Sequence, residues 1–296
     1  MSNVSRQYVK PCEIEDFDDP ELLKYLRSVQ PGLTPDEERH RKNWEFAMLA
    51  SYLSEVGALN DDASALAVAA GHEAPLYWLS NRIRKVVATD IYGDGGFASR
   101  EATATMLNQP EAFAPYPYRE RHLEVRHVNA LNLEFPDASF DIVYSLSSIE
   151  HFGGPKEIRK AAREMSRVLK PGGHLVIVTE CLIEPRFIDR PAVQFAVRCI
   201  SLNTRAKGAT PARRTIDSLT PAEIQRDIVQ QVEGWLVQPL QTHVSARSFD
   251  NLITWRGAGE LTARTGNPYP HILLKGPGAP WTSVFLAFAK PDRNRR

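Results

Sequence analysis

The sequence predicts an α/β fold in which a mostly parallel sheet is covered by helices on both faces. Apolar runs with the length and content of buried strands alternate with amphipathic helical patterns, and this alternation favours parallel strands. The expected strands are residues 64–71, 84–90, 123–128, 139–145, 174–179, 234–237 and 281–288. The chain has 296 residues, which is enough for one elaborated domain of this kind.

The clearest helix of the sequence precedes the fifth expected strand. Pro155 marks its start, and Lys170-Pro171-Gly172-Gly173 contains the residue types that end a helix. Its apolar residues recur at intervals of three and four, which places them on one face. They are Ile158, Ala161, Ala162, Met165, Val168 and Leu169.

Residues 1–60 are expected to form an N-terminal helical extension or lid. Thr34-Pro35-Asp36-Glu37 has the pattern of a helix start, and the apolar run that follows predicts one buried helix ending near Gly57. The remaining domain is assigned to residues 61–290. Within it, residues 183–219 and 241–280 show little regular pattern and are expected to be substrate-facing insertions.

The composition indicates an ordinary globular protein. Thirty-six basic and thirty-six acidic residues cancel, so charge gives no reason to expect nucleic acid as a partner. No run approaches the ~20 apolar residues of a membrane span, and no secretory signal is evident, so a cytoplasmic location is expected. Cys12, Cys181 and Cys199 lack metal-site or disulfide spacing. We expect no metal, and nothing indicates the oligomeric state.

A ligand site is expected where the first two strands end. The turn Ala69-Ala70-Gly71-His72-Glu73 contains small residues that let a ligand approach the backbone, and Asp90 ends the second strand. In open α/β sheets ligands bind at the carboxyl ends of the strands, where an acid can accept hydrogen bonds from ribose hydroxyls. The alternative is a tight turn and an acidic loop residue without a ligand.

Three further segments carry a resemblance to a known family. The segment from Asn129 to Val143 resembles the D-A-x-x-L-P-F-P-D-x-S-F-D-x-V signature of class I S-adenosylmethionine-dependent methyltransferases. Ser148-Ile149-Glu150-His151 resembles the E-H that follows their fourth strand. Lys170-Pro171-Gly172-Gly173-His174-Leu175 resembles their L-K-P-G-G-x-L turn. The resemblance is good over residues 64–180 and looser over 220–290.

The chain departs from this family in its first motif, E/D-x-G-x-G-x-G. The four places of that motif hold Ala67, Ala69, Gly71 and Glu73, so one glycine remains and the leading acid is absent. Two interpretations stay open at this point. The site is either a subfamily variant that binds the cofactor or a degenerate site in a non-catalytic scaffold.

The resemblance implies a Rossmann-like sheet of seven strands with the last one antiparallel, and S-adenosylmethionine as cofactor. It implies that Gly71 and its neighbours Ala69 and His72 line the methionine end of the cofactor. The other implied contacts are the ribose with Asp90, the adenine with Ile91, Asn129 and Ala130, and the sulfonium with Ser145 and Leu146.

The resemblance also implies methyl transfer, and we expect a hydroxyl of a small metabolite or glycan as acceptor. A hydroxyl acceptor is helped by a base. His151 is the first candidate and Glu150 the second. The alternative for His151 is a helix-start residue that only caps or packs. A nicotinamide-dependent oxidoreductase is the rival enzyme class, but it requires a G-x-G-x-x-G turn that is missing here.

Overall fold

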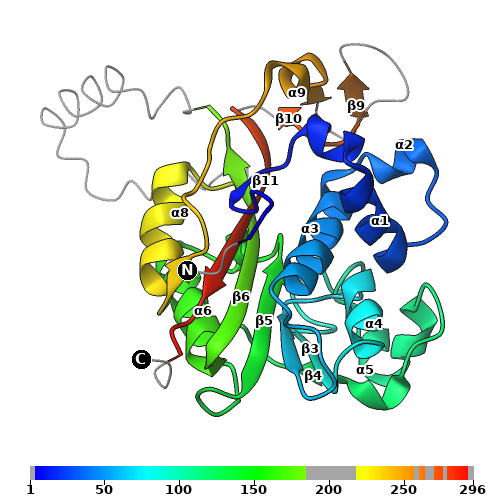
Figure 1. Ribbon diagram of the computed structural model, residues 1–296, viewed down its shortest axis with the longest axis vertical. Coiled ribbons are helices and arrows are strands. Elements are labelled where there is room, and N and C mark those ends of the chain that lie inside the picture. Colours follow the sequence, from blue (N-terminus) through cyan, green and yellow to red (C-terminus); the bar gives the residue numbers. More distant parts are fainter. Residues whose placement is uncertain (1–3, 185–217, 257–259, 264–269, 276–278, 293–296) are drawn as a thin grey trace, which may run out of the picture.

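Five parallel strands form the centre of the computed structural model, which describes residues 4–184, 218–256, 260–263, 270–275 and 279–292. Their order is β4-β3-β2-β5-β6, and β11 closes this series antiparallel to β6 (Figure 1). The mostly parallel sheet predicted from the sequence is therefore confirmed. The bounds are β2 Ser64–Val68, β3 Lys85–Asp90, β4 Leu123–His127, β5 Phe140–Leu146, β6 Leu169–Leu182 and β11 Pro280–Ala289.

The sheet extends beyond the seven expected strands and has eleven strands within the described residues. The sixth expected strand is the short β7, which pairs with β11, as β1 does. Three more strands come from the region 241–280, where the sequence showed little pattern. The bounds are β1 Lys10–Pro11, β7 Trp235–Leu236, β8 Ile253–Arg256, β9 Glu260–Ala263 and β10 Leu274–Lys275. The expected insertion 183–219 and Cys199 lie almost wholly outside the described residues.

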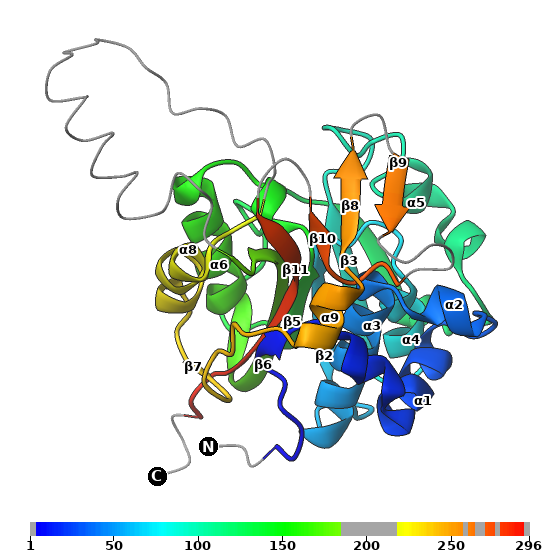
Figure 2. The same cartoon turned by 90° about the horizontal axis from the view of Figure 1, so that it is seen from above.

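Helices cover both faces of the sheet, as Figure 2 shows from above. One layer holds α6 and α8, and the other holds α1, α3 and α4, with the short α2 beside them. The bounds are α1 Pro20–Val29, α2 Pro35–Glu38, α3 Arg41–Glu55, α4 Ala74–Ser80, α5 Thr105–Asn108, α6 Pro155–Val168, α8 Pro221–Asp227 and α9 Ala246–Asp250. No helix in these described ranges is both long and apolar enough to cross a bilayer.

The single helix expected from residue 34 to Gly57 is divided into α2 and α3. The His40 side chain causes the second start, because its Nδ1 accepts a hydrogen bond from the Lys42 backbone N–H at 3.1 Å. The His40 ring also stacks on His271 with centroids 4.2 Å apart. Histidine is not a usual capping residue, so the local pattern did not predict this break.

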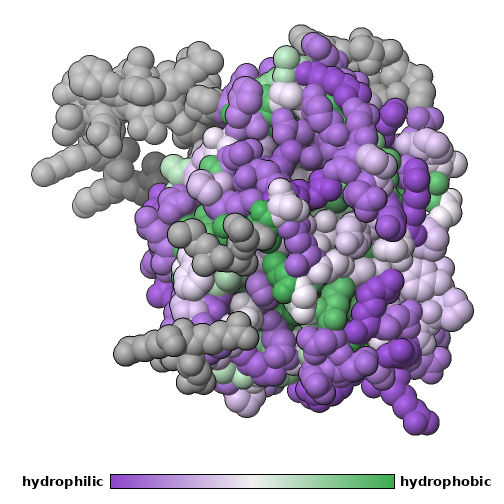
Figure 3. Space-filling model, viewed as in Figure 1, coloured by the Kyte–Doolittle hydropathy of each residue, from purple (hydrophilic) through white to green (hydrophobic). Residues whose placement is uncertain are grey.

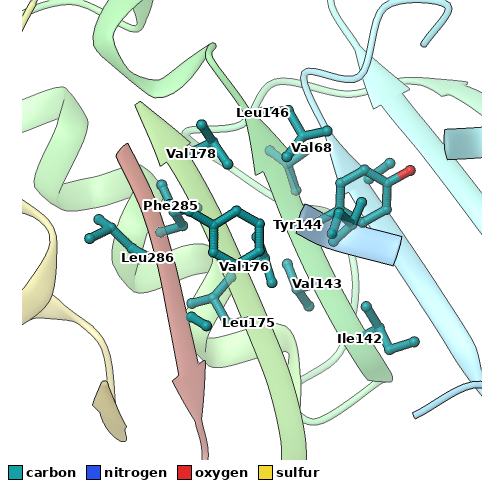
Figure 4. Packing of buried hydrophobic residues seen from close by; sticks show 14 of the residues in the cluster. Val68, Ile142, Val143, Tyr144, Leu146, Leu175, Val176, Val178, Phe285 and Leu286 are labelled. Carbon is teal, nitrogen blue, oxygen red and sulfur yellow. The ribbon is translucent and has the colours of Figure 1, made fainter. Parts of the chain in front are cut away.

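The core lies on both sides of the central strands. Figure 4 shows Val143 of β5 and Val176 of β6 beside Phe285 of β11, and all three are fully buried. Each such side chain contributes roughly 1.5–3 kcal/mol through its removal from water. The apolar stripe predicted for α6 is buried as expected. Hydrophilic residues predominate on the face seen in Figure 3.

The amino ends of the strands are held together by Asp141. Its carboxylate accepts hydrogen bonds from the backbone N–H and hydroxyl of Ser64 and forms an ion pair with Lys170 at 2.9 Å. Gly173 packs against the same place, since a Cβ there would lie 2.7 Å from the Asp141 carbonyl oxygen. The segments around residues 140–141 and 170–173 therefore stabilise the sheet at the edge opposite the carboxyl ends.

Candidate active site at the carboxyl edge of the sheet

A cavity of about 780 Å³ lies at the carboxyl edge of the parallel strands. The strand order reverses between β2 and β5, which makes this position the topological switch point of the sheet. The cavity is lined by residues that follow both strands, and α3 contributes a third wall. We call it the edge cavity and define it by Lys42, Gly71, Asp90, Ile91, Leu146 and His151.

The turn after β2 brings the backbone to the cavity surface. Gly71 has a φ of +49°, and a Cβ at this position would lie 2.7 Å from the Glu101 carbonyl oxygen. Its N–H donates to Asp90 Oδ2 at 2.9 Å, and Tyr92 donates its hydroxyl hydrogen to the Gly71 carbonyl at 2.7 Å. Only glycine fits this place without strain. Ala69, at a place where the family motif has glycine, holds the left-handed conformation with φ +52°.

Asp90 is fixed at the end of β3 by two backbone donors. Oδ2 accepts from Gly71, and Oδ1 accepts from the Ile91 N–H at 2.8 Å. Burial raises the pKa of Asp90, and these two hydrogen bonds oppose that shift. Each carboxylate oxygen keeps further acceptor capacity, so the side chain can still accept hydrogen bonds from a diol in the cavity.

The carboxyl end of β5 supplies the opposite wall through Leu146, Ser147 and Ser148. Ser147 has a φ of +50°, which is strained for a residue with a Cβ. Its hydroxyl donates to Glu45 Oε1 at 2.6 Å, so the strained residue is bound to α3. The β5 terminus and the N-terminal extension therefore form one wall together.

The structure brings most of the predicted site residues together. Seven of them line the edge cavity: Ala69, Gly71, His72, Asp90, Ile91, Leu146 and His151. Four others do not: Asn129, Ala130, Ser145 and Glu150. Ala130 and Ser145 are buried, and Asn129 Oδ1 accepts from the Leu131 N–H at 2.8 Å to stabilise its own turn. Roles for Asn129, Ala130 and Ser145 at the cofactor stay predictions.

The two candidate bases occupy different environments. His151 is exposed at the cavity, with its ring centroid 5.1 Å from that of Phe97. Glu150 is 2% exposed and accepts hydrogen bonds from the Thr179 hydroxyl at 2.8 Å and the Glu180 N–H at 3.3 Å. Burial, with Glu180 nearby, raises the pKa of Glu150 above its usual value. Glu150 points into the protein, so a direct role on a substrate is not supported by its placement.

A buried ionic network that sequence analysis missed forms the α3 wall. Arg41 pairs with Glu180 at 2.7 Å and with Glu45 at 3.4 Å. Lys42 pairs with Glu45 at 3.1 Å, pairs with Glu73 and donates to the Leu146 carbonyl at 3.0 Å. The available signal was Glu45, a carboxylate within an otherwise apolar helical run. Its own cation partners, Arg41 and Lys42, are close in sequence. The two other carboxylates, Glu180 and Glu73, lie 139 residues from Arg41 and 31 residues from Lys42, so local pattern could not identify them.

Aromatic rings make up much of the remaining wall. Phe46, Phe97, Phe113 and Phe152 all line the cavity. The His72 ring stacks on Phe113, with centroids 4.6 Å apart and planes inclined by 17°. A hollow with apolar walls and a few fixed polar groups is typical of a small-molecule site.

Comparison with known proteins identifies the segment that carries this cavity. Residues 66–177 match the family model described as "Methyltransferase domain". Residues 66–177 form a methyltransferase domain of the S-adenosylmethionine-dependent class. The methyltransferase domain begins in β2 and reaches into β6, so it contains the turn at Gly71, Asp90, the end of β5 and His151.

Curated relatives match this chain only in part. The chain is 44% identical over 59 residues to "Probable tRNA methyltransferase 9B" of Mus musculus, covering 20% of this chain and 13% of that protein. It is 34% identical over 89 residues to "Uncharacterized methyltransferase YcgJ" of Bacillus subtilis, covering 30% and 34%. It is 43% identical over 78 residues to "O-methyltransferase resE" of Aspergillus sclerotiorum, covering 26% and 28%. The match thus spans about a third or less of each relative.

Among solved structures, the YcgJ protein of Bacillus subtilis is similar with a TM-score of 0.44 and 18% identity, over 79% of this chain and 94% of that chain.

The methyltransferase domain family implies S-adenosylmethionine as cofactor. The edge cavity fits this group, because its lining includes the backbone of Gly71, the carboxylate of Asp90 and the apolar side chain of Ile91. Within the described part of the chain, no cluster of His, Cys, Asp or Glu is arranged to hold a metal ion.

Proposed function

We propose that this chain transfers the methyl group of S-adenosylmethionine to a hydroxyl oxygen of a small metabolite or glycan. The observation that carries the proposal is the position of the edge cavity at the strand-order reversal, with Gly71, Asp90 and Leu146 on its walls. A sheet of this class binds its nucleotide-like ligand at this point.

The cofactor would be held by residues of three segments. Asp90 would accept hydrogen bonds from the ribose hydroxyls, and Ile91 would pack against the adenine. The turn at Gly71 would contact the methionine end, because Gly71 lines the cavity just after the carboxyl end of β2. When bound, S-adenosylmethionine supplies an activated methyl group on a positively charged sulfur, and its departure leaves a neutral thioether.

His151 is the residue best placed to act on an acceptor. Its imidazole lines the cavity, whereas Glu150 does not. His151 would take the proton of the acceptor hydroxyl, whose oxygen would receive the methyl group that the cofactor supplies. The enzyme contributes alignment and exclusion of water, since the methyl donor is already activated.

The aromatic lining of the edge cavity and the zero net charge of the chain support a small metabolite or glycan as acceptor. Four phenylalanine rings suit an acceptor with apolar surface. The formal net charge is zero, which provides no general attraction for a polyanion. The relative from Aspergillus sclerotiorum is named an O-methyltransferase, and this agrees with the proposal. The relative from Mus musculus is named a tRNA methyltransferase, so tRNA belongs among the acceptors to be tested.

The test is a transfer assay with radiolabelled S-adenosylmethionine against three acceptor pools: hydroxylated small molecules, oligosaccharides and total tRNA. The proposal expects label in one of the first two pools, in a base-stable ether. Label in tRNA alone would replace the acceptor class. Binding of the cofactor without transfer to any pool would favour the scaffold alternative.

A further inference from the structure

Lys42 and Glu73 form an ion pair inside the edge cavity. Glu73 occupies the last glycine place of the family's first motif, and its side chain does not cap the helix α4 that follows it. It reaches the Lys42 ammonium instead, and both residues line the cavity. The Glu73 side chain is 16% exposed, so it is mostly withdrawn from water yet faces the ligand space. This substitution of glycine by glutamate is therefore accompanied by a matched cation.

The charges around this pair do not balance. In the ion pairs of the described residues, three carboxylates, Glu45, Glu73 and Glu180, share two permanent cations, Arg41 and Lys42. His40 adds no charge at neutral pH, because burial and the adjacent Arg41 lower its pKa to about 4. Burial opposes the charge of Lys42, but Glu45 and Glu73 outweigh this effect and raise the pKa of its ammonium. Among the described residues, Glu73 therefore shares its one cation, Lys42, with Glu45, and an ammonium from a ligand would give Glu73 a partner of its own.

The pKa of Glu73 shows that this residue is the less well compensated member of the pair. Burial raises its pKa to about 7; Lys42 opposes this shift, and Glu45 and Asp90 increase it. Lys42, in contrast, has two carboxylates and the Leu146 carbonyl as partners. Buried charges are stable only when paired, so Glu73 gains most from an incoming ammonium.

We propose that Glu73 and Lys42 together recognise the zwitterionic amino-acid end of the cofactor. Glu73 binds the ammonium of this end and Lys42 binds its carboxylate. The ion pair between Glu73 and Lys42 is thus replaced by two ion pairs with the ligand. The proposal rests on the function above and deepens it. It assigns to this chain a charged determinant of cofactor specificity where the family motif has glycine.

The test compares two ligands that differ in this end alone. S-adenosylhomocysteine carries the amino-acid group, and 5′-methylthioadenosine has the same nucleoside and thioether without it. Calorimetric titration gives both dissociation constants for the wild type, Glu73→Gln and Lys42→Met. The charge-matched controls are Glu111→Gln and Lys156→Met, two exposed residues outside the cavity.

The wild type is expected to bind S-adenosylhomocysteine at least about tenfold more tightly than 5′-methylthioadenosine. Glu73→Gln should weaken S-adenosylhomocysteine by about tenfold or more and leave 5′-methylthioadenosine within about twofold, as expected for one lost charge-assisted contact. Lys42→Met should act in the same direction, and both controls should match the wild type. The Gln variant keeps the shape of Glu73, so folding is retained, and the ligand ratio is internal to each variant.

The outcomes separate the two proposals. If the wild type binds both ligands and Glu73→Gln leaves the ratio of their dissociation constants unchanged, the proposed recognition by Glu73 and Lys42 is wrong and the proposed function stands. Equal weakening of both ligands also overturns it, because the effect would then be on cavity shape. A wild type that binds neither ligand at millimolar concentration overturns the proposed function itself.

Discussion

Replacement of Gly71 by alanine is the most direct perturbation of the cavity wall. The left-handed backbone at φ +49° costs an alanine about 1–2 kcal/mol. The new Cβ would lie 2.7 Å from the Glu101 carbonyl oxygen, and overpacking of this kind costs about 1–3 kcal/mol more. We therefore expect Gly71→Ala to lower the free energy of unfolding by roughly 2–5 kcal/mol.

Gly32→Ala is the matched control for this prediction. Gly32 has a φ of +87°, and no atom lies within 4 Å of the place a Cβ would occupy, so an alanine there would carry the backbone penalty alone. Urea unfolding of both variants should show a loss of about 1–2 kcal/mol for Gly32→Ala and a clearly larger one for Gly71→Ala. Equal losses would refute the close packing of the turn against Glu101. Gly71→Ala should also weaken S-adenosylhomocysteine, since it displaces the N–H bonded to Asp90.

Two other predictions concern His151 and Glu73. His151→Ala should lower kcat by about 10²–10⁴-fold and leave the S-adenosylhomocysteine dissociation constant within about twofold; unchanged turnover would remove His151 as the base. The pKa of Glu73 is raised to about 7, so the folded state holds this proton more tightly than the unfolded state does. The protonated Glu73 side chain therefore contributes fully to stability below about pH 4.5, and this contribution is lost as the pH rises through 7. Between these pH values, the unfolding free energy of the wild type should fall relative to that of Glu73→Gln by up to about 3 kcal/mol. A pH-independent difference would contradict this assignment.

Much of the fold could be predicted from the sequence, because the spacing of apolar residues determines where many of its helices and strands form. The stripe of α6 and the apolar runs of β2, β3 and β5 are examples, with ends within a few residues of those expected. The β6 strand is longer than predicted at both ends, because Leu169 pairs with Phe140 of β5 and Leu182 lies opposite Trp281 of β11. The pairing with β11 depends on a strand a hundred residues away and leaves no local pattern.

The positions of candidate site residues could be predicted where a residue lies close to the carboxyl end of a strand. Gly71, Asp90 and His151 each lie at or soon after the carboxyl end of a strand, and the structure brings all three to one cavity, as the carboxyl-edge rule predicts. The α3 wall was not predictable in this way. Lys42 reaches Glu73 and Leu146 only after the N-terminal helices have packed on the sheet, and the break at His40 sets where α3 begins. The direction in which Glu150 points also depended on burial against β6.

Calorimetric titration of S-adenosylhomocysteine into the wild type and Asp90→Ala tests the central claim that the edge cavity is the cofactor site. Asp90 is fixed by two backbone donors and faces the cavity, so its loss removes the acceptor for the ribose hydroxyls. We expect the wild type to bind one equivalent with a micromolar dissociation constant and Asp90→Ala to bind at least about tenfold more weakly. Absence of binding to the wild type at millimolar ligand, or equal affinity of the two proteins, would contradict the claim.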